Sequence, residues 1–423
     1  MSKRIALVLC QTSDSDSQRI WTPPLTTPLL AEILQARGWI VSLFDSRLLI
    51  NPNNTNEQNV SNLANAVLEA LPDVVGFSFL SPNAQFSEQV AFAICNQNPK
   101  LPIIAGGAHC SSAPYLYTRP YNVIVRGEAD DIIVEIADKL IKDGMPNRQL
   151  IIQSPVPNLQ DSPIVVGANW FPYNDIYEGA EYRTGYVQLG RGCPFSCSFC
   201  NSSNGQRTRA RPTEVILKEV ELLKDKFGVK YIGFIDSIAT SVPFFDTTFE
   251  SISDIFAGNT ISLNSTFVRF TELVAQVVAD FNGDVTIWFG LETGSERIGR
   301  QELKGKWNKQ ATFKAINLCK KYGIKIGLNC IFGFADENDD DRRQTIELLR
   351  ELQPDYPNPN ILNPIPGTLI YNRYLQTGLL RDPLDLSIWD AKRIRETGEG
   401  PINDLDYQKV YDAYEEVENL KNN

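Results

Sequence analysis

Three cysteines stand in one short loop near the middle of this 423-residue chain. Cys193, Cys197 and Cys200 lie in the segment Gly-Arg-Gly-Cys-Pro-Phe-Ser-Cys-Ser-Phe-Cys, with three and then two residues between them. Thiolates are soft ligands that suit iron–sulfur clusters, and the usual set for such a cluster is four. No nearby cysteine supplies the fourth ligand. The spacing therefore predicts a 4Fe-4S cluster in which one iron keeps an open position for chemistry.

Two other uses of these thiols are weaker hypotheses. A zinc site would need a fourth Cys or His at short spacing, and the only histidine of the chain, His109, is far away in sequence. A disulfide framework would need an oxidising compartment. Because the eight cysteines show no disulfide-like spacing, we expect a reducing, cytoplasmic location.

The Cys-x3-Cys-x2-Cys loop resembles that of the radical S-adenosylmethionine (SAM) superfamily. The resemblance implies that the open iron binds the amino and carboxylate groups of SAM, whose reductive cleavage then gives a 5′-deoxyadenosyl radical. Phe199, just before the last cysteine, matches the aromatic residue that the family usually has there. We therefore expect Phe199 to be part of the cofactor-binding site.

Length and composition limit the possible partners. A chain of 423 residues with 43% hydrophobic residues can form two domains with separate cores. The net charge of −11 argues against a general nucleic-acid or anionic-membrane surface. No apolar run approaches the roughly 20 residues that span a bilayer. We expect no nucleic-acid partner and no membrane association.

The N-terminal part alternates between strand and helix patterns, which is typical of a doubly wound, Rossmann-like parallel sheet. Its first strand, 4–10, is a near-continuous apolar run, as expected for a strand buried on both faces. Further strands are predicted at 39–44, 73–79, 102–105 and 122–125, and helices at 25–37, 57–70, 84–97 and 129–142.

Small and polar residues follow several of these strands, at the sheet edge where ligands of such folds bind. They are Ser78, Ser81, Gly106, Gly107, His109 and Glu128. Turn formation and helix capping are the simpler interpretation of each one. As a set, they resemble the strand ends of the cobalamin-binding domain that precedes many radical SAM domains, which implies cobalamin as a cofactor. For His109, a polar contact is favoured over direct metal ligation.

We divide the chain into a cobalamin-binding-type domain (1–145), a linker (146–183) with an edge strand near 149–153, a catalytic domain (184–377) and a helical C-terminal extension (378–423). The catalytic domain shows six strand–helix units, too few for a closed eight-fold barrel. A partial (β/α)6 barrel is the fold of the family. Its strands are predicted at 186–190, 231–235, 261–265, 284–291, 324–332 and near 360–363.

The resemblance also implies residues that hold SAM. Glu292, in the segment Leu-Glu-Thr-Gly-Ser-Glu, resembles the acidic residue of the fourth strand that helps to bind SAM; otherwise it is a carboxylate at a helix start. Asp236 matches a position that often contacts the SAM amino group. Ser265 and Arg269 match positions that contact its ribose or carboxylate.

The resemblance implies methyl transfer to an unactivated carbon of a natural-product or peptide substrate. Methylcobalamin would supply the methyl group, and the adenosyl radical would abstract the substrate hydrogen. The family further implies an electron donor such as flavodoxin or ferredoxin.

Two alternatives remain open. Cys330, late in the strand at 324–332, could donate a hydrogen atom to a substrate radical if it faces the barrel interior. That would give a cobalamin-independent epimerase. The simpler interpretation of Cys330 is a buried, small hydrophobic residue. A non-enzymatic redox sensor that only stores the cluster is the other alternative, and the open ligand position and the Glu292 segment argue against it.

Overall fold

The computed structural model describes residues 2–10, 24–51, 53–116, 120–171, 183–201, 204–303, 306–382, 394 and 396–420. The chain separates into two compact units, Met1–Ala180 and Glu181–Asn423, which are described one at a time. The finer boundaries expected at 145, 183 and 377 stay predictions.

The first unit contains a six-stranded parallel sheet in the order β2-β1-β3-β4-β5-β6. The strands are β1 (Arg4–Cys10), β2 (Ile40–Asp45), β3 (Val74–Phe79), β4 (Ile103–Gly106), β5 (Val123–Arg126) and β6 (Leu150–Gln153). The edge strand expected inside the linker is thus the sixth strand of this sheet. The strand order reverses between β1 and β3, which in a doubly wound sheet is where ligands bind.

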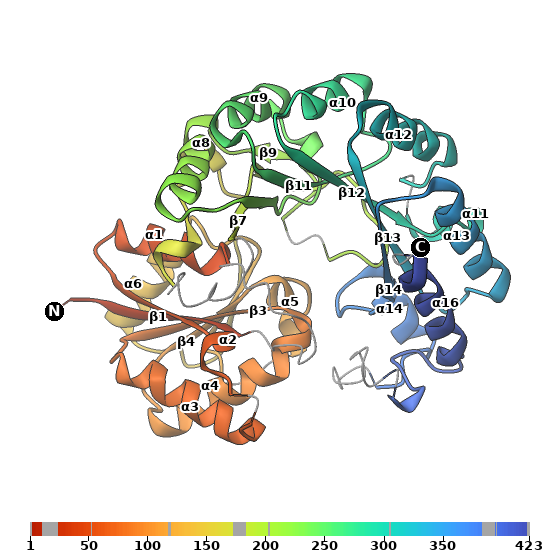
Figure 1. The fold of residues 1–423 in the computed structure, drawn as a ribbon. Coiled ribbons are helices and arrows are strands. Elements are labelled where there is room, and N and C mark those ends of the chain that lie inside the picture. The colour runs from red at the N-terminus through yellow and green to blue at the C-terminus, as the bar shows by residue number, and fades with distance from the viewer. Residues whose placement is uncertain are drawn as a thin grey trace. The chain divides into compact units, whose positions relative to one another are not determined.

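Helices cover both faces of this first sheet, with α1 and α6 on one face and α3 and α4 on the other (Figure 1). The helices are α1 (Thr26–Gln35), α2 (Ser46–Leu49), α3 (Asn56–Glu69), α4 (Ala84–Gln97), α5 (Ala108–Ser112) and α6 (Ile133–Asp143). The apolar positions Ile133, Ile136 and Leu140 of α6 recur at helical spacing and are buried in a core shared with α1 and the sheet. The sequence did not reveal α2 and α5, which are too short to show a period.

The second unit contains another six-stranded parallel sheet, in which each strand lies beside the next strand of the series. The strands are β7 (Thr184–Val187), β10 (Tyr231–Phe234), β11 (Thr260–Ser265), β12 (Asp284–Glu292), β13 (Lys325–Phe332) and β14 (Tyr356–Ile361). The helices lie on the outer side of the curved sheet (Figure 1). The predicted partial (β/α)6 barrel is confirmed.

The helices of the second unit are α8 (Thr213–Glu221), α9 (Phe245–Phe256), α10 (Glu272–Ala279), α11 (Glu296–Glu302), α12 (Lys309–Tyr322), α13 (Asp339–Leu352), α14 (Leu369–Gln376) and α16 (Tyr407–Asn419). The sequence analysis missed α9, α11 and α14. It also missed a small antiparallel ribbon of β8 (Gly190–Arg191) and β9 (Arg209–Ala210). This ribbon is important because it flanks the cysteine loop.

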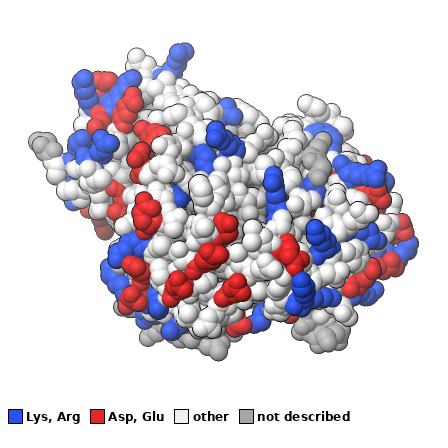
Figure 2. Space-filling model, turned by 90° about the horizontal axis from the view of Figure 1, so that it is seen from above, with Lys and Arg blue, Asp and Glu red and all other residues white. Residues whose placement is uncertain are grey.

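On the surface shown in Figure 2, basic and acidic side chains are interspersed, so this side of the molecule offers no unbroken basic stripe. Among the described residues, no helix is both long and apolar enough to cross a membrane.

Candidate active site

The loop that carries the three cysteines follows β7 and is pinned by the β8–β9 ribbon. A Cβ at Gly190 would lie 2.2 Å from the carbonyl oxygen of Arg209, and one at Gly192 would lie 2.2 Å from that of Arg207. Gly192 also has a φ of 103°, which L side chains rarely adopt. Both glycines are therefore required by the close approach of two backbone segments.

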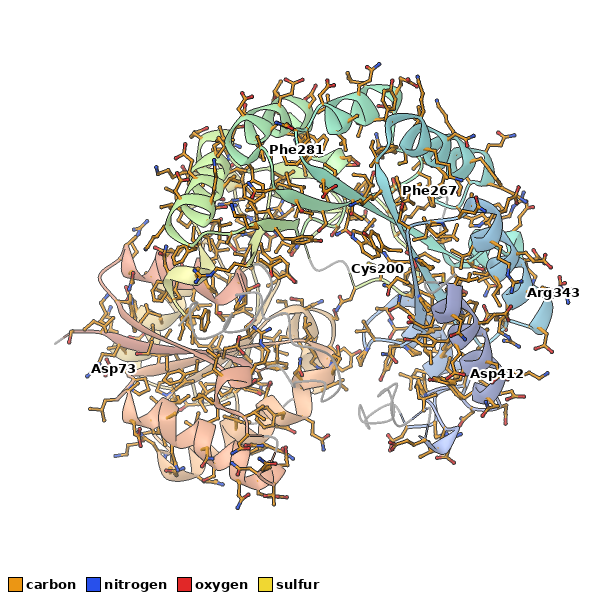
Figure 3. The ribbon with its side chains drawn as sticks, in the orientation of Figure 1. Asp73, Cys200, Phe267, Phe281, Arg343 and Asp412 are labelled. Carbon is orange, nitrogen blue, oxygen red and sulfur yellow. The ribbon has the colours of Figure 1, made fainter. Side chains whose placement is uncertain are left out.

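The three cysteine thiols are free and act on one another electrostatically. Burial raises the pKa of the Cys197 thiol to about 11, and the Lys306 ammonium opposes that rise. Cys193 is half-buried, while Cys200 is exposed on the concave side of the curved sheet (Figure 3). Because iron binds the thiolate form, cluster assembly at these residues would release protons.

The arrangement of these thiols fits a 4Fe-4S cluster better than a single metal ion. Among the described residues, no three His, Cys, Asp or Glu side chains converge as the ligands of one ion would. In an iron–sulfur cluster each cysteine instead binds a different iron, so the thiols need to be neighbours without meeting at a point. The loop provides three such thiols and no fourth.

A buried carboxylate holds the middle of the cysteine loop. Glu302, at the end of α11, is fully buried, and its carboxylate accepts a hydrogen bond from the hydroxyl of Ser198. The Ser198 amide also donates to the Glu302 carbonyl at 2.8 Å. Arg373 of α14 pairs with the same carboxylate at 2.5 Å. Ser198 lies between Cys197 and Cys200, so Glu302 fixes the backbone that presents these two thiols.

Phe199 packs into the core beneath the loop. Its ring meets that of Phe334 edge-on, with centroids 6.1 Å apart, and it lies against the apolar cluster around Ile298 and Tyr371. Phe199 is half-buried. It stabilises the loop by packing, and a direct contact between Phe199 and SAM stays a prediction.

Glu292 ends β12 in an unusual conformation. Its φ is 62°, in the left-handed region that favours glycine, and the strand register shifts between Gly290 and Glu292. Burial raises the pKa of the Glu292 carboxyl, while Lys306, with its Nζ 3.8 Å from Oε1, lowers it. Strained, buried and charged residues of this kind cluster at functional sites.

The residues after Glu292 are locked to helix α13. The amide of Gly294 donates to the Thr345 hydroxyl at 2.9 Å, and the Ser295 hydroxyl donates to Asp341 at 2.5 Å. A Cβ at Gly294 would lie 2.5 Å from the carbonyl oxygen of Gln344. The backbone of α13 therefore determines where β12 ends and where Glu292 is presented.

Asp236 supports the loop from behind. Its carboxylate accepts hydrogen bonds from the amides of Gly190 at 2.7 Å and Leu189 at 2.9 Å. Burial raises the pKa of Asp236 to about 6, although these two amides lower it. Both oxygens are thus used to position the start of the cysteine loop. The predicted contact between Asp236 and the SAM amino group stays a prediction.

Ser265 and Arg269 differ in how they are placed. The Ser265 hydroxyl is buried at the end of β11 and lies 2.7 Å from that of Thr240. Arg269 is exposed beyond the same strand. Their predicted contacts with SAM stay predictions.

Cys330, the alternative hydrogen donor, lies late in β13. Along β13, the alternate residues Leu328, Cys330 and Phe332 are fully buried. The intervening residues Asn329 and Ile331 are partly exposed. Because successive side chains of a strand point to opposite faces, Cys330 faces the helical layer and not the concave face where a substrate would bind. This placement favours packing over hydrogen donation, and the donor role of Cys330 stays a prediction.

In the first unit, the strand ends bring several of the predicted residues together. His109 is fully buried, and its Nδ1 lies 2.8 Å from the Ser81 hydroxyl. A Cβ at Gly107 would lie 2.7 Å from the carbonyl oxygen of Phe79 and 3.2 Å from the Ser78 hydroxyl. Burial lowers the pKa of His109 to about 4, so the ring is neutral at pH 7.

Glu128 and Gly106 extend this edge. Gly106 ends β4, and a Cβ there would meet only the carbonyl oxygen of Phe77, at 3.9 Å. The carbonyl of Glu128, after β5, accepts from the hydroxyl of Ser154. The Ser111 hydroxyl links the two turns, because it accepts from the Gly127 amide and donates to the Gly107 carbonyl, each at 2.9 Å. Small residues thus leave room at this polar edge, which fits a large cofactor such as cobalamin.

Sequence reasoning missed the residues that support the cysteine loop. Glu302 and Arg373 are far from the cysteines in sequence, and a glutamate near a helix end ordinarily indicates a solvated surface. Only Ser198, a hydroxyl between two expected ligands, could have suggested that a buried acceptor was needed.

Comparison with protein families gives two matches on this chain. Residues 187–349 match the family described as the radical SAM superfamily, and residues 21–137 match the B12 binding domain. The first match spans the cysteine loop and Glu292, and the second spans β2 to β5 with the strand ends described above.

Individual proteins resemble most of the chain. The chain is 28% identical over 400 residues to an uncharacterized methyltransferase of Pyrococcus horikoshii, covering 89% of this chain and 84% of that protein. It is 23% identical over 356 residues to the anaerobic magnesium-protoporphyrin IX monomethyl ester cyclase of Cereibacter sphaeroides, covering 77% of this chain but only 56% of the cyclase.

Among solved structures, the fold resembles the radical SAM methyltransferase TsrM of Kitasatospora setae with tryptophan and a SAM analogue bound. The TM-score is 0.69 at 16% sequence identity, covering 90% of this chain and 78% of TsrM. At this identity the likeness shows a shared fold.

Proposed function

Because the chain belongs to the radical SAM superfamily and carries a B12-binding domain, we propose that it is a cobalamin-dependent enzyme that transfers a methyl group to an unactivated carbon of a small molecule. The observation that carries this proposal is the set of three free thiols in one loop, which the Leu303 carbonyl joins to Lys306, the ion-pair partner of the buried Glu292.

The residues divide the work between the two units. Cys193, Cys197 and Cys200 would hold the cluster, and Glu292 would bind SAM at the end of β12. When bound, the cluster would supply an electron to SAM, and cobalamin would carry the methyl group. In the first unit, the edge formed by Ser78, Gly106 and Gly107 would bind cobalamin, with the buried, neutral His109 holding Ser81 behind that edge.

The concave face of the second sheet supports a small, uncharged substrate. Trp288 stacks on Tyr356 there, with ring centroids 6.0 Å apart. One row closer to the strand ends, the Asn358 amide donates to the Asn329 side chain at 2.7 Å. A Cβ at Gly327 would lie 2.3 Å from the Trp288 ring, so the glycine lets the ring lie flat on the strand. Aromatic and amide groups suit a planar, uncharged molecule better than a polyanion.

The burial pattern of β13 disfavours the epimerase alternative, because Cys330 lies on the face opposite to the partly exposed Asn329 and Ile331. The proposal includes a natural product or peptide as the substrate and a flavodoxin or ferredoxin as the electron donor. It also includes a cytoplasmic location.

The test is anaerobic purification of the full chain with hydroxocobalamin supplied. Iron, sulfide and cobalamin are then quantified, and the products formed from SAM under dithionite are analysed. We expect one 4Fe-4S cluster and one cobalamin per chain, and both S-adenosylhomocysteine and 5′-deoxyadenosine as products. A cluster that cleaves SAM in a protein that binds no cobalamin would contradict methyl transfer.

A further inference from the structure

Lys306 lies where the cysteine loop and the end of β12 meet. Its side chain is only 15% exposed, and its Nζ lies 3.8 Å from Oε1 of Glu292. The carbonyl of Leu303 accepts two hydrogen bonds, one from the Lys306 amide at 3.0 Å and one from the Cys197 thiol at 3.8 Å. One carbonyl thus joins the backbone of Lys306 to a cysteine of the loop.

The neighbouring strand leaves room for this lysine. A Cβ at Gly290 would lie 2.9 Å from Lys306 Nζ and 2.2 Å from Glu292 Oε1. A side chain at Gly290 would therefore collide with both ends of the ion pair. The bare glycine and the register shift that follows it place the ammonium and the carboxylate together beside the loop.

The charge of Lys306 reaches the cysteines. Burial is the main cause that raises the pKa of the Cys197 thiol, and partial loss of hydration raises the pKa of the Cys200 thiol although its side chain is exposed. Glu292 raises both pKa values further, and Lys306 opposes these effects. A cluster held by three thiolates beside Glu292 would gather negative charge, and the Lys306 ammonium faces that charge directly.

We propose that Lys306 is a positioning charge that sets the reduction potential of the cluster, with Glu292 acting in the opposite direction. The inference rests on the cluster of the proposed function. Reduction adds one electron to the cluster, and a nearby cation stabilises the added negative charge more than that of the oxidised state. In the SAM-free enzyme, the reduction potential of the cluster is therefore more positive with Lys306 present than with its charge removed.

The experiment is an anaerobic redox titration of the reconstituted full chain without SAM, followed by electron paramagnetic resonance of the reduced cluster. Lys306→Gln removes the charge, and Lys306→Arg keeps it. Lys314→Gln is the matched control, because it removes the charge of an exposed lysine of α12 and leaves the cysteine loop unchanged. Iron and sulfide are counted in every sample.

We expect Lys306→Gln to lower the ratio of reduced to oxidised cluster at a fixed applied potential by about tenfold, which is a shift of about 59 mV to more negative potential. Lys306→Arg and Lys314→Gln should titrate like the wild type, and Glu292→Gln should shift to more positive potential. An unshifted Lys306→Gln variant with full cluster content would overturn the inference.

Lys306→Gln leaves a buried carboxylate unpaired and can fail to fold or to hold the cluster. The double variant Glu292→Gln, Lys306→Gln removes both charges and is compared with Glu292→Gln alone. The same negative shift is expected between these two, and its absence overturns the inference. A wild-type protein that holds no cluster overturns the proposed function as well.

Discussion

The carboxyl edges of the two sheets are held together in different ways. In the first unit, neutral groups connect the ends of β3 and β4, as in the contact of His109 with Ser81. At the end of β2, by contrast, the buried Asp45 pairs with Arg47. In the second unit, buried carboxylates make the connections: Asp236 holds two loop amides, and Glu302 holds Ser198. Hydrogen bonds to a charged acceptor are roughly twice as strong as neutral ones. The difference suggests that the loop presenting three thiolates needs firmer fixation than an edge that receives an intact cofactor.

The largest expected effect is on the cluster itself. Cys197→Ala removes one of three thiol ligands, so iron and sulfide should fall to background after anaerobic reconstitution. Bound cobalamin should stay at the wild-type level, because the first unit has its own core. Cys95→Ala, a substitution in α4 of the first unit, is the control. Wild-type iron content in Cys197→Ala would show that the loop does not bind the cluster.

The neutral edge should weaken in acid. Burial lowers the pKa of His109 from 6.5 to about 4, so the unfolded chain binds the proton more readily than the folded one. The stabilisation of the first unit is therefore present above pH 6.5 and is lost as the pH falls toward 4, by about 3 kcal/mol. Hydrogen exchange of this unit, compared with His109→Gln at each pH, measures the difference. Parallel pH profiles for the two proteins would contradict it.

The stability of the second unit, where Asp236 holds the loop, should depend on pH in the opposite direction. Burial raises the pKa of Asp236 from 3.8 to about 6, so the folded state here holds the proton more tightly. Its contribution to stability is present below pH 3.8 and is lost as the pH rises through about 6, by about 3 kcal/mol at most. Hydrogen exchange in the second unit of Asp236→Asn should lack this loss. If Asp236→Asn and the wild type respond equally between pH 4 and 6, the assignment fails.

The smallest expected effect is a loss of stability in two glycine variants of the first unit. Comparing them separates the cost of backbone strain from the cost of a steric clash. Gly107→Ala combines a φ of 98° with a Cβ 2.7 Å from a carbonyl oxygen, and should cost about 2 kcal/mol. It should also weaken cobalamin binding. Gly38→Ala has a similar φ of 81° but nothing within 4 Å, and should cost about 1 kcal/mol. Urea denaturation monitored by hydrogen exchange compares them, and equal losses would show that the close contact does not matter.

Much of the fold followed from the sequence. The strands and helices longer than one turn were largely predicted, because their apolar residues recur with a period that local geometry fixes. The first strand of the second sheet lies at Thr184–Val187 and not at 186–190. Leu189 and Gly190, which we expected in the strand, belong to the loop instead, because their amides donate hydrogen bonds to Asp236.

The sequence by itself determined which residues we propose as cluster ligands, because Cys193, Cys197 and Cys200 are neighbours in the chain and their spacing is typical of such a site. Only the tertiary structure decided what surrounds them. Ser198 and Glu302 are 104 positions apart, and no local pattern links them. The face on which Cys330 lies depends on which alternate residues of β13 point toward the helices, and that is set by how the strand pairs within the sheet. Contacts of this range arise when distant elements pack together, so no window of sequence could reveal them.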